Sequence, residues 1–197
     1  MLIGDSNIAL ALSSIAFELT GRDDAYQLVD VARSGAAIRT DDCPALTLNC
    51  ATHDFWKHRL AEALQRVTPD GFIVNLGIND TDAPGTPDTP GYTAYGAKID
   101  WLMHLLPASK PVWWSNLPCD IEPKTRAVGC AAVNAAIRVA PKRWPHLIVL
   151  DWASLAKGRP KYLLPPKGEV HLSVQGGLAW AHLIATTLDA HFPARTH

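Results

Sequence analysis

Short apolar runs alternate along the chain with longer stretches in which apolar residues recur every three or four positions. The short runs predict strands at residues 1–4, 27–33, 71–76, 111–115 and 146–150. Several of them are almost continuously apolar, which is typical of parallel strands that are covered on both faces. The longer stretches predict helices at residues 7–19, 53–67, 92–106, 124–140 and 174–191. This strict alternation predicts an α/β fold, a three-layer α/β/α sandwich around about five parallel strands.

Two segments rich in proline and glycine, residues 81–92 and 157–170, interrupt the alternation as loops. The pattern of strands and helices continues on both sides of each loop, so neither segment resembles a linker between domains. A length of 197 residues suits one domain with a substantial core. We therefore expect a single domain over residues 1–197.

Charge and hydropathy exclude several function classes. The chain carries 18 basic and 19 acidic residues, interspersed, for a formal net charge of -1. This balance gives neither the basic surface expected for nucleic acid nor a polybasic face for anionic lipid. No apolar run approaches the roughly 18–20 residues that span a bilayer, and the first residues lack the basic segment of a secretory signal. A neutral or modestly polar small molecule is the expected partner.

The four cysteines form two local pairs, Cys43 with Cys50 and Cys119 with Cys130. An even count at short, loop-like spacings favours two disulfides, Cys43–Cys50 and Cys119–Cys130, and an extracytoplasmic or secreted setting. Zinc is the competing interpretation, although neither pair has C-x-x-C spacing and no histidine pair completes a ligand set. Four free thiols in a cytosolic protein remain a further alternative, and four cysteines allow three pairings.

Candidate chemistry lies at the carboxyl ends of the predicted strands. In an open parallel sheet, ligands bind beyond these ends, at the point where the strand order reverses. For five strands ordered 2-1-3-4-5, this point lies between the first and third strands. The segments that follow those two strands read GDSN, residues 4–7, and GIND, residues 77–80. Both begin with glycine and continue with small polar residues, so both are candidates for a reactive site.

Ser6 falls in the predicted turn between the first strand and the first helix. Unpaired backbone N–H groups and the helix dipole favour negative charge there, which suits an acyl-transfer nucleophile. The alternative is that Ser6 is only the N-cap of the helix. Asn79 offers a side-chain amide as an oxyanion donor, or it is ordinary loop chemistry that ends the strand. Gly35, after the second strand, offers a backbone N–H, or it is only a turn residue.

Of the eight histidines, His171 lies on the loop just before the last predicted helix. From that loop an imidazole can reach the strand ends and act as a base for Ser6. Other residues at the same edge are the candidate substrate contacts: Asp5, Asn7, Asn116 and Trp152.

Taken together, GDSN, the Ser-Gly at residues 34–35, GIND and the string VHLSVQGG around His171 resemble the SGNH or GDSL-type hydrolase family. The four motifs occur in the family's order and are spread over nearly the whole chain. The resemblance implies a flavodoxin-like sandwich that hydrolyses or transfers acyl esters without a metal or organic cofactor. It implies Ser6 as nucleophile and His171 as general base. It also implies an oxyanion hole formed by the Ser6 N–H, the Gly35 N–H and the Asn79 side chain.

One position departs from the family pattern. The family usually has an aspartate three residues before the histidine, and this chain has Gly168 there. That carboxylate orients the imidazole and stabilises the imidazolium. Glu169 and the backbone carbonyl of Gly168 are equally ranked replacements, and Asp151, at the end of the fifth predicted strand, ranks behind them. If no acceptor exists, triads deprived of their aspartate suggest a rate penalty of up to roughly 10⁴.

Three functions follow from these residues. The first is a serine esterase for small acyl groups, carried on polar molecules such as carbohydrate. The second is an O-acyltransferase that uses the same residues with a sugar hydroxyl in place of water. The third is a domain that binds such a ligand without turnover because of Gly168. Retention of Ser6, Asn79 and His171 favours catalysis, since a pure binding site would not need all three.

Overall fold

The protein is described by a computed structural model that covers residues 1–20, 26–38, 55–81, 90–121, 124–165 and 170–192. Its centre is a parallel sheet in the order β1-β2-β3-β4. The strands are β1 (Leu2–Gly4), β2 (Phe72–Asn75), β3 (Val112–Ser115) and β4 (Leu147–Leu150). Their register pairs Gly4 with Asn75, and Ser115 with Leu150. The carboxyl ends of the strands therefore lie along one edge, as the sequence predicted.

The predicted second strand is present only as an extended segment beside β1. Leu2 N donates to Val29 O at 2.8 Å, Val31 N donates to Leu2 O at 3.0 Å, and a single parallel bridge joins Leu2 to Asp30. β1 is only three residues long, so it offers little length for a ladder on that side. The described residues thus contain four strands rather than about five, while the spatial order expected from 2-1-3-4-5 is retained.

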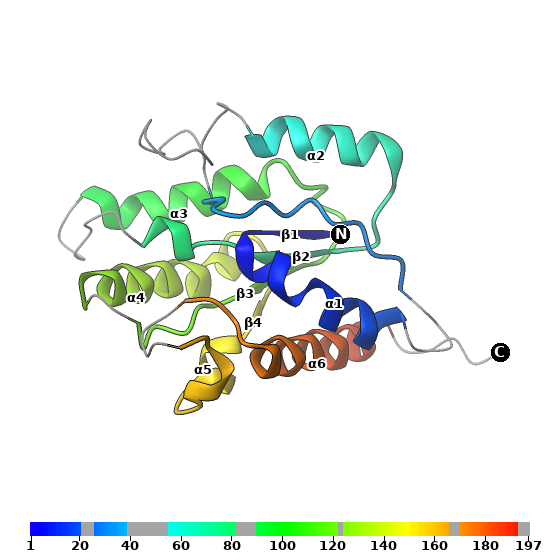
Figure 1. Cartoon of the computed structure of the whole chain (residues 1–197). Coiled ribbons are helices and arrows are strands. Elements are labelled where there is room, and N and C mark those ends of the chain that lie inside the picture. Colours follow the sequence, from blue (N-terminus) through cyan, green and yellow to red (C-terminus); the bar gives the residue numbers. More distant parts are fainter. Residues whose placement is uncertain (21–25, 39–54, 82–89, 122–123, 166–169, 193–197) are drawn as a thin grey trace.

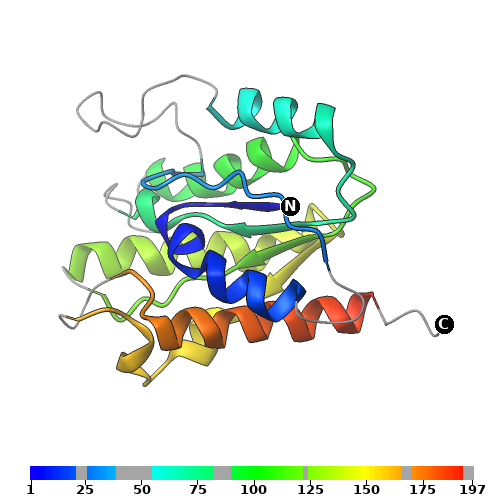
Figure 2. The ribbon, with the colours of Figure 1, turned by 45° about the vertical axis from the view of Figure 1, so that its right-hand side comes forward.

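Helices cover both faces of the sheet (Figures 1 and 2). The helices are α1 (Ser6–Thr20), α2 (Phe55–Arg66), α3 (Pro90–Met103), α4 (Lys124–Val139), α5 (Trp152–Ala156) and α6 (Val174–His191). Three short 3₁₀ turns complete the order: η2 (Ile78–Asp80), η3 (Ala140–Lys142) and η4 (Pro160–Tyr162). The five long helices overlap the predicted ones, and α5 is an additional short helix after β4.

Two apolar cores form because alternate strand residues point to opposite faces. Trp114 belongs to the core under α2, α3 and α4, whereas Trp113 belongs to the core under α1, α5 and α6. Burial of these two adjacent tryptophans on opposite faces confirms the expected three layers. No helix among the described residues has the length and apolar character needed to cross a membrane.

Candidate active site

Ser6 and His171 meet at the carboxyl edge of β1, although 165 positions separate them in the sequence. Ser6 is the first residue of α1, and His171 lies three residues before α6 begins. Ser6 Oγ lies 3.0 Å from His171 Nε2. A hydroxyl that donates to Nε2 requires a neutral imidazole with its proton on Nδ1. The pair therefore has the geometry of a nucleophile beside its general base.

Asp5, rather than Ser6, caps α1. The Asp5 carboxylate accepts a 2.9 Å hydrogen bond from the backbone N–H of Asn7. This contact satisfies one of the unpaired N–H groups of the first turn, so the Ser6 hydroxyl is not needed as a cap. The Asn7 side chain in turn accepts a 3.0 Å bond from Leu172 N. The GDSN segment thus holds both its own helix and the backbone next to His171.

Asp5 is completely buried, and its second carboxylate oxygen has no hydrogen-bond partner. Burial, with a smaller contribution from the charge of Asp80, raises the pKa of Asp5 to about 7, although the bond from Asn7 opposes the shift. Because its side chain is not exposed, Asp5 cannot contact a substrate without movement, in contrast to the expectation from sequence. It acts beneath the site, as part of its support.

The turn after β2 and the loop after the edge segment are tied together at the same edge. Asn79 Nδ2 donates to Ala36 O at 2.9 Å, next to Gly35. An amide carries two hydrogens, so one remains for a ligand. Gly77 has a φ of 125°, which favours glycine and lets the chain turn sharply out of β2. Within the described residues, no hydrogen bond occupies the backbone N–H of Ser6 or of Gly35.

Asp80 is a supporting residue that the sequence did not single out. Its buried carboxylate accepts 2.9 Å from Ile38 N and pairs with Lys98 Nζ at 3.0 Å. Its backbone carbonyl also accepts a 3.0 Å bond from Tyr95 OH. Asp80 stands inside GIND, so its place was visible in the sequence. No local pattern, however, indicates a lysine 18 residues later on α3 as its partner.

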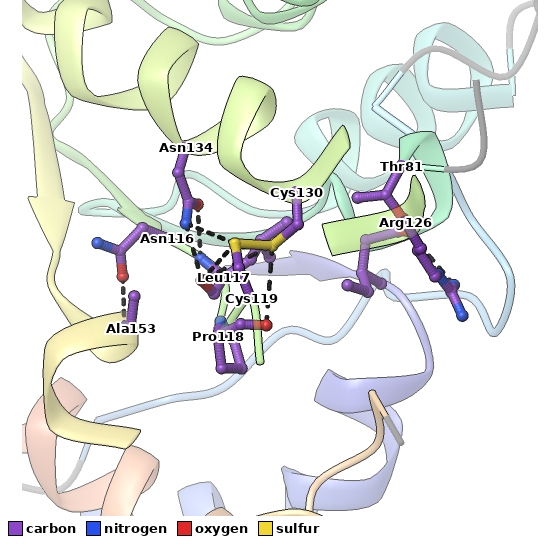
Figure 3. The surroundings of a disulfide bond; sticks show 10 residues. Thr81, Asn116, Leu117, Pro118, Cys119, Arg126, Cys130, Asn134 and Ala153 are labelled. Atoms are coloured by element: carbon purple, nitrogen blue, oxygen red, sulfur yellow. Dashed lines mark hydrogen bonds between the residues drawn. A yellow bond between two sulfur atoms is a disulfide. The ribbon is translucent and has the colours of Figure 1, made fainter. Parts of the chain in front are cut away.

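The predicted disulfide between Cys119 and Cys130 is present and joins the loop after β3 to α4 (Figure 3). Asn134, one turn further along α4, accepts from Leu117 N and donates to Leu117 O, both at 2.8 Å. These contacts fix one wall of the carboxyl edge. Cys43 and Cys50, the other predicted pair, lie outside the described residues.

α4 also contacts the turn that carries Asn79. Arg126 donates to Thr81 Oγ1 at 3.1 Å, and the two side chains lie together in Figure 3. Gly129 allows this approach, because a Cβ at that position would collide with the backbone of Thr81. The same helix therefore supports the turn after β2 and, through the disulfide, the loop after β3.

Asn116 and Trp152 belong to the wall around α5. Asn116 donates to Asp151 Oδ1 at 2.7 Å and accepts from Ala153 N at 2.7 Å. Trp152 is only 2% exposed, so it cannot reach a substrate unless the wall moves. Asp151 caps α5 at Ser154 N, and hydrogen bonds from Ser154 and then Asn116 lower the pKa of its carboxyl.

The partner of the His171 imidazole stays a prediction. Asp151 is engaged with Asn116 and Ser154 at the start of α5, which accounts for its carboxylate without His171. Gly168 and Glu169, the equally ranked replacements for the family's aspartate, lie outside the described residues. In the described part of the chain, no three histidine, cysteine or acidic side chains gather in a way that could hold a metal ion.

Two hollows lie near Ser6 and His171. A cavity of about 10 Å³, close to the size of one water molecule, is lined by Asn7, Asn75, Leu172 and Trp152 among others. A larger cleft of about 1000 Å³ lies between the loop after β3 and residues 153–165. Leu117 and Pro118 line both hollows. Ser6 and His171 do not line the larger one, so that cleft lies beside the Ser6–His171 contact.

The chain is similar over nearly its whole length to solved hydrolase structures. A lipase/acylhydrolase from Enterococcus faecalis has a TM-score of 0.70 at 15% identity, with 96% of this chain and 95% of that chain covered. A member of the lipolytic G-D-S-L family from Veillonella parvula has a TM-score of 0.68 at 12% identity, covering 98% and 97%.

The C-terminal catalytic domain of Streptococcus pneumoniae peptidoglycan O-acetyltransferase A is also similar, with a TM-score of 0.66 at 19% identity, covering 96% of this chain and 92% of that one. Neither a protein-family model nor a curated protein matches the chain. These likenesses show that the chain has the SGNH or GDSL-type hydrolase fold, as the resemblance implied.

Proposed function

We propose that the protein is a serine hydrolase that cleaves or transfers small acyl groups through an acyl-enzyme on Ser6. The observation that carries this proposal is the 3.0 Å contact between Ser6 Oγ and His171 Nε2 at the start of a helix. The helix N-terminus favours the negative charge that develops there during acyl transfer. The SGNH fold and the capping of α1 by Asp5, which leaves the serine hydroxyl to His171, support the same assignment.

In the first step, the Ser6 oxygen attacks the ester carbonyl while His171 Nε2 takes the hydroxyl proton. The carbonyl oxygen becomes negative and accepts hydrogen bonds from the Ser6 N–H, the Gly35 N–H and the Asn79 amide. Collapse of this intermediate breaks the ester bond, and His171 returns the proton to the departing alcohol. Water, or an acceptor hydroxyl, then attacks the acyl-enzyme by the same route and releases Ser6.

His171 needs an acceptor for its Nδ1 proton so that Nε2 faces Ser6. We infer that either the Gly168 carbonyl or the Glu169 carboxylate fills this role. Replacement of Glu169 by glutamine separates the two. Unchanged turnover in Glu169→Gln would assign the role to the backbone carbonyl, whereas a fall of about 10²-fold or more would assign it to Glu169.

An O-acyltransferase is the second candidate, and it uses the same residues. Its support is the likeness to the catalytic domain of a peptidoglycan O-acetyltransferase. The two candidates differ in what attacks the acyl-enzyme. Release of acetate from an acetyl donor in the presence of sugar acceptors indicates hydrolysis, whereas acetylated sugar indicates transfer.

Turnover of 4-nitrophenyl acetate tests the proposed nucleophile. Ser6→Ala is expected to lower kcat by about 10³-fold or more, because no other group there can form the acyl-enzyme. Ser13→Ala, a change at an exposed serine of the same helix, is the matched control and should retain full activity. Equal activity in both variants would rule out Ser6 as the nucleophile.

We further propose that the acyl group is small and that its carrier is polar, such as carbohydrate. Comparing nitrophenyl esters of two to twelve carbons with acetylated sugars tests this. A clear preference for long acyl chains would contradict it.

A further inference from the structure

The cleft beside the catalytic pair is bounded by two walls of different character. One wall is the loop after β3 with its disulfide and Asn134, and it contains Leu117, Pro118 and Cys119. The other wall is the segment from α5 through η4, and it ends in Leu163, Leu164 and Pro165. At about 1000 Å³, the cleft is at the upper end of the range for sites that hold small molecules.

The second wall carries a local excess of positive charge. Lys157, Arg159 and Lys161 all line the cleft and are exposed, and Asp120 is the acidic residue among the lining residues that the structure describes. None of the three cations forms an ion pair with a carboxylate of the described residues. This excess is a local feature, because the whole chain has a formal net charge of -1. The cleft therefore offers an anion several cationic partners that no carboxylate in the described ranges already binds.

Tyr162 orders part of this wall. The guanidinium of Arg159 lies 5.5 Å from the centre of the Tyr162 ring, and its Nη1 lies 3.2 Å from the Tyr162 hydroxyl. The Tyr162 ring stacks in turn on buried Trp152, with centroids 5.7 Å apart. A guanidinium positioned over an aromatic ring loses less freedom on binding an anion than an unsupported one does. Arg159 is therefore supported by Tyr162, which in turn packs on the core residue Trp152.

The same wall holds the backbone around His171. Leu164 N donates to His171 O at 2.9 Å, and Ser173 N donates to Tyr162 O at 3.0 Å. The Ser173 hydroxyl also donates to Lys161 O at 2.6 Å, and Ser173 itself lines the cleft. A ligand in the cleft thus lies against the segment that carries the catalytic base. This adjacency suits the part of a substrate that carries the acyl group.

We propose that the cleft binds the carrier of the acyl group and that this carrier is an anionic saccharide, bearing carboxylate or phosphate groups. The three cations of the second wall bind its charges. The proline and leucine side chains that line both walls contact the sugar faces. This inference rests on the proposed function and names the substrate class for the same site.

Equilibrium binding by calorimetry tests the proposal without requiring turnover. The probes are trigalacturonate for carboxylates, glucose 1-phosphate for a phosphate, and neutral maltotriose as the matched uncharged saccharide. We expect an anionic probe to bind at least about tenfold more tightly than maltotriose, and more weakly as salt rises from 50 to 500 mM. Whichever anionic probe binds more tightly identifies the anionic group. Equal affinity for anionic and neutral probes, or no binding of either anion, would overturn the proposal.

A variant without the three positive charges tests whether the anion binds in this cleft. Lys157→Gln, Arg159→Gln and Lys161→Gln combined should lower the affinity for the anionic probe by about tenfold or more. The control combines Arg59→Gln, Lys110→Gln and Lys142→Gln, which removes three charges away from the cleft and should retain binding. Unchanged binding in the cleft variant would overturn the proposal. If that variant does not fold, the salt dependence of anion binding to the wild-type protein still tests the proposal.

The two proposals fail in distinguishable ways. Absence of 4-nitrophenyl acetate turnover alongside salt-sensitive, anion-selective binding would reject the hydrolase assignment while the cleft still binds anions. Full turnover with no anion selectivity would reject the anionic carrier alone.

Discussion

The two sides of Ser6 are built differently. On one side is the Asn79 flank, residues 35–38 and 77–80, where Asp80 joins Ile38 N to Lys98 and Asn79 joins Ala36 O. On the other side is the His171 flank, residues 162–164 and 170–173, which is held by backbone bonds along a partly exposed segment and by the bond from Leu172 N to the Asn7 side chain. The Asn79 flank is held by the largely buried ion pair between Asp80 and Lys98. The His171 flank is held mainly by a short antiparallel backbone pairing near the surface.

This difference suggests that the Asn79 flank and the His171 flank have different roles. Oxyanion donors work best when they are fixed before the reaction, and a buried network provides that rigidity. In the proposed mechanism His171 takes and returns a proton, and its flank borders the cleft in which we place the carrier. We therefore expect changes in the Asn79 flank to reduce stability first and changes in the His171 flank to reduce activity first.

The largest expected effect is on activity, in the His171 flank. His171→Ala should lower kcat for 4-nitrophenyl acetate by about 10²- to 10⁴-fold, because the general base is lost. Its free energy of unfolding should change by less than about 1 kcal/mol, since the backbone bonds at residues 171–173 remain. Steady-state kinetics and urea denaturation measure the two quantities. His58→Ala, at an exposed histidine of α2, is the control; a similar loss of activity there would contradict the assignment.

The next effect is on stability, in the Asn79 flank. Asp80→Ala should lower the free energy of unfolding by about 3–5 kcal/mol, because it breaks the largely buried ion pair with Lys98, whose side chain is 11% exposed, and removes the acceptor of Ile38 N. Combining it with Lys98→Met should restore part of that loss. Urea denaturation checks both variants. If Asp80→Ala unfolds at the wild-type midpoint, the contrast between the two flanks is wrong.

Most of the architecture could be predicted from the sequence, because each element has a local cause. The apolar runs predicted the strands, and the Gly-Asp-Ser turn predicted the start of α1. Because the carboxyl ends of parallel strands lie at one edge, the sequence also predicted that GDSN and GIND are close together. The contact between Ser6 and His171 followed from motif order. The weaker prediction was the edge strand, since pairing beside a three-residue strand depends on β1 as much as on residues 27–33.

Interactions between distant elements could not be predicted in this way. Lys98 is one of several lysines on helical patterns, and only the packing of α3 brings it to Asp80. The sequence predicted Asp5 as a substrate contact. In the structure Asp5 caps α1 and is buried by the helix and the sheet. The sequence predicted a proline-rich loop for the wall that runs from α5 through η4. No local sequence pattern indicates that this wall pairs with the segment around His171.

A smaller effect on stability is expected where the disulfide supports the cleft. Replacing Cys119 and Cys130 by serine removes the cross-link of a short loop and should lower the free energy of unfolding by about 2–4 kcal/mol. Turnover of 4-nitrophenyl acetate should remain within a few-fold, because Asn134 still holds both the N–H and the carbonyl of Leu117. A stability equal to that of the wild type would show that the disulfide does not fasten this wall.

The subtlest effect concerns Asp5, the buried cap of α1. Burial raises the folded pKa of Asp5 to about 7, above its unfolded value near 3.8, so the folded state retains a proton that the unfolded state has lost between these values. The contribution of Asp5 to stability is therefore fully present below the unfolded pKa and declines as pH rises towards 7. Asp5→Asn keeps an oxygen for Asn7 N and should make stability less dependent on pH over this window. Urea midpoints between pH 4 and 8 measure the slope, and an unchanged slope would contradict the assignment.

The central claim is that Ser6 is the nucleophile, and the most direct measurement is the location of a fluorophosphonate adduct by peptide mass spectrometry. The probe reacts with an activated serine hydroxyl, and His171 at 3.0 Å provides that activation. We predict a single adduct on Ser6, absent in Ser6→Ala and strongly slowed in His171→Ala. An adduct on any other serine, or no adduct at a pH where His171 is neutral, would contradict the account.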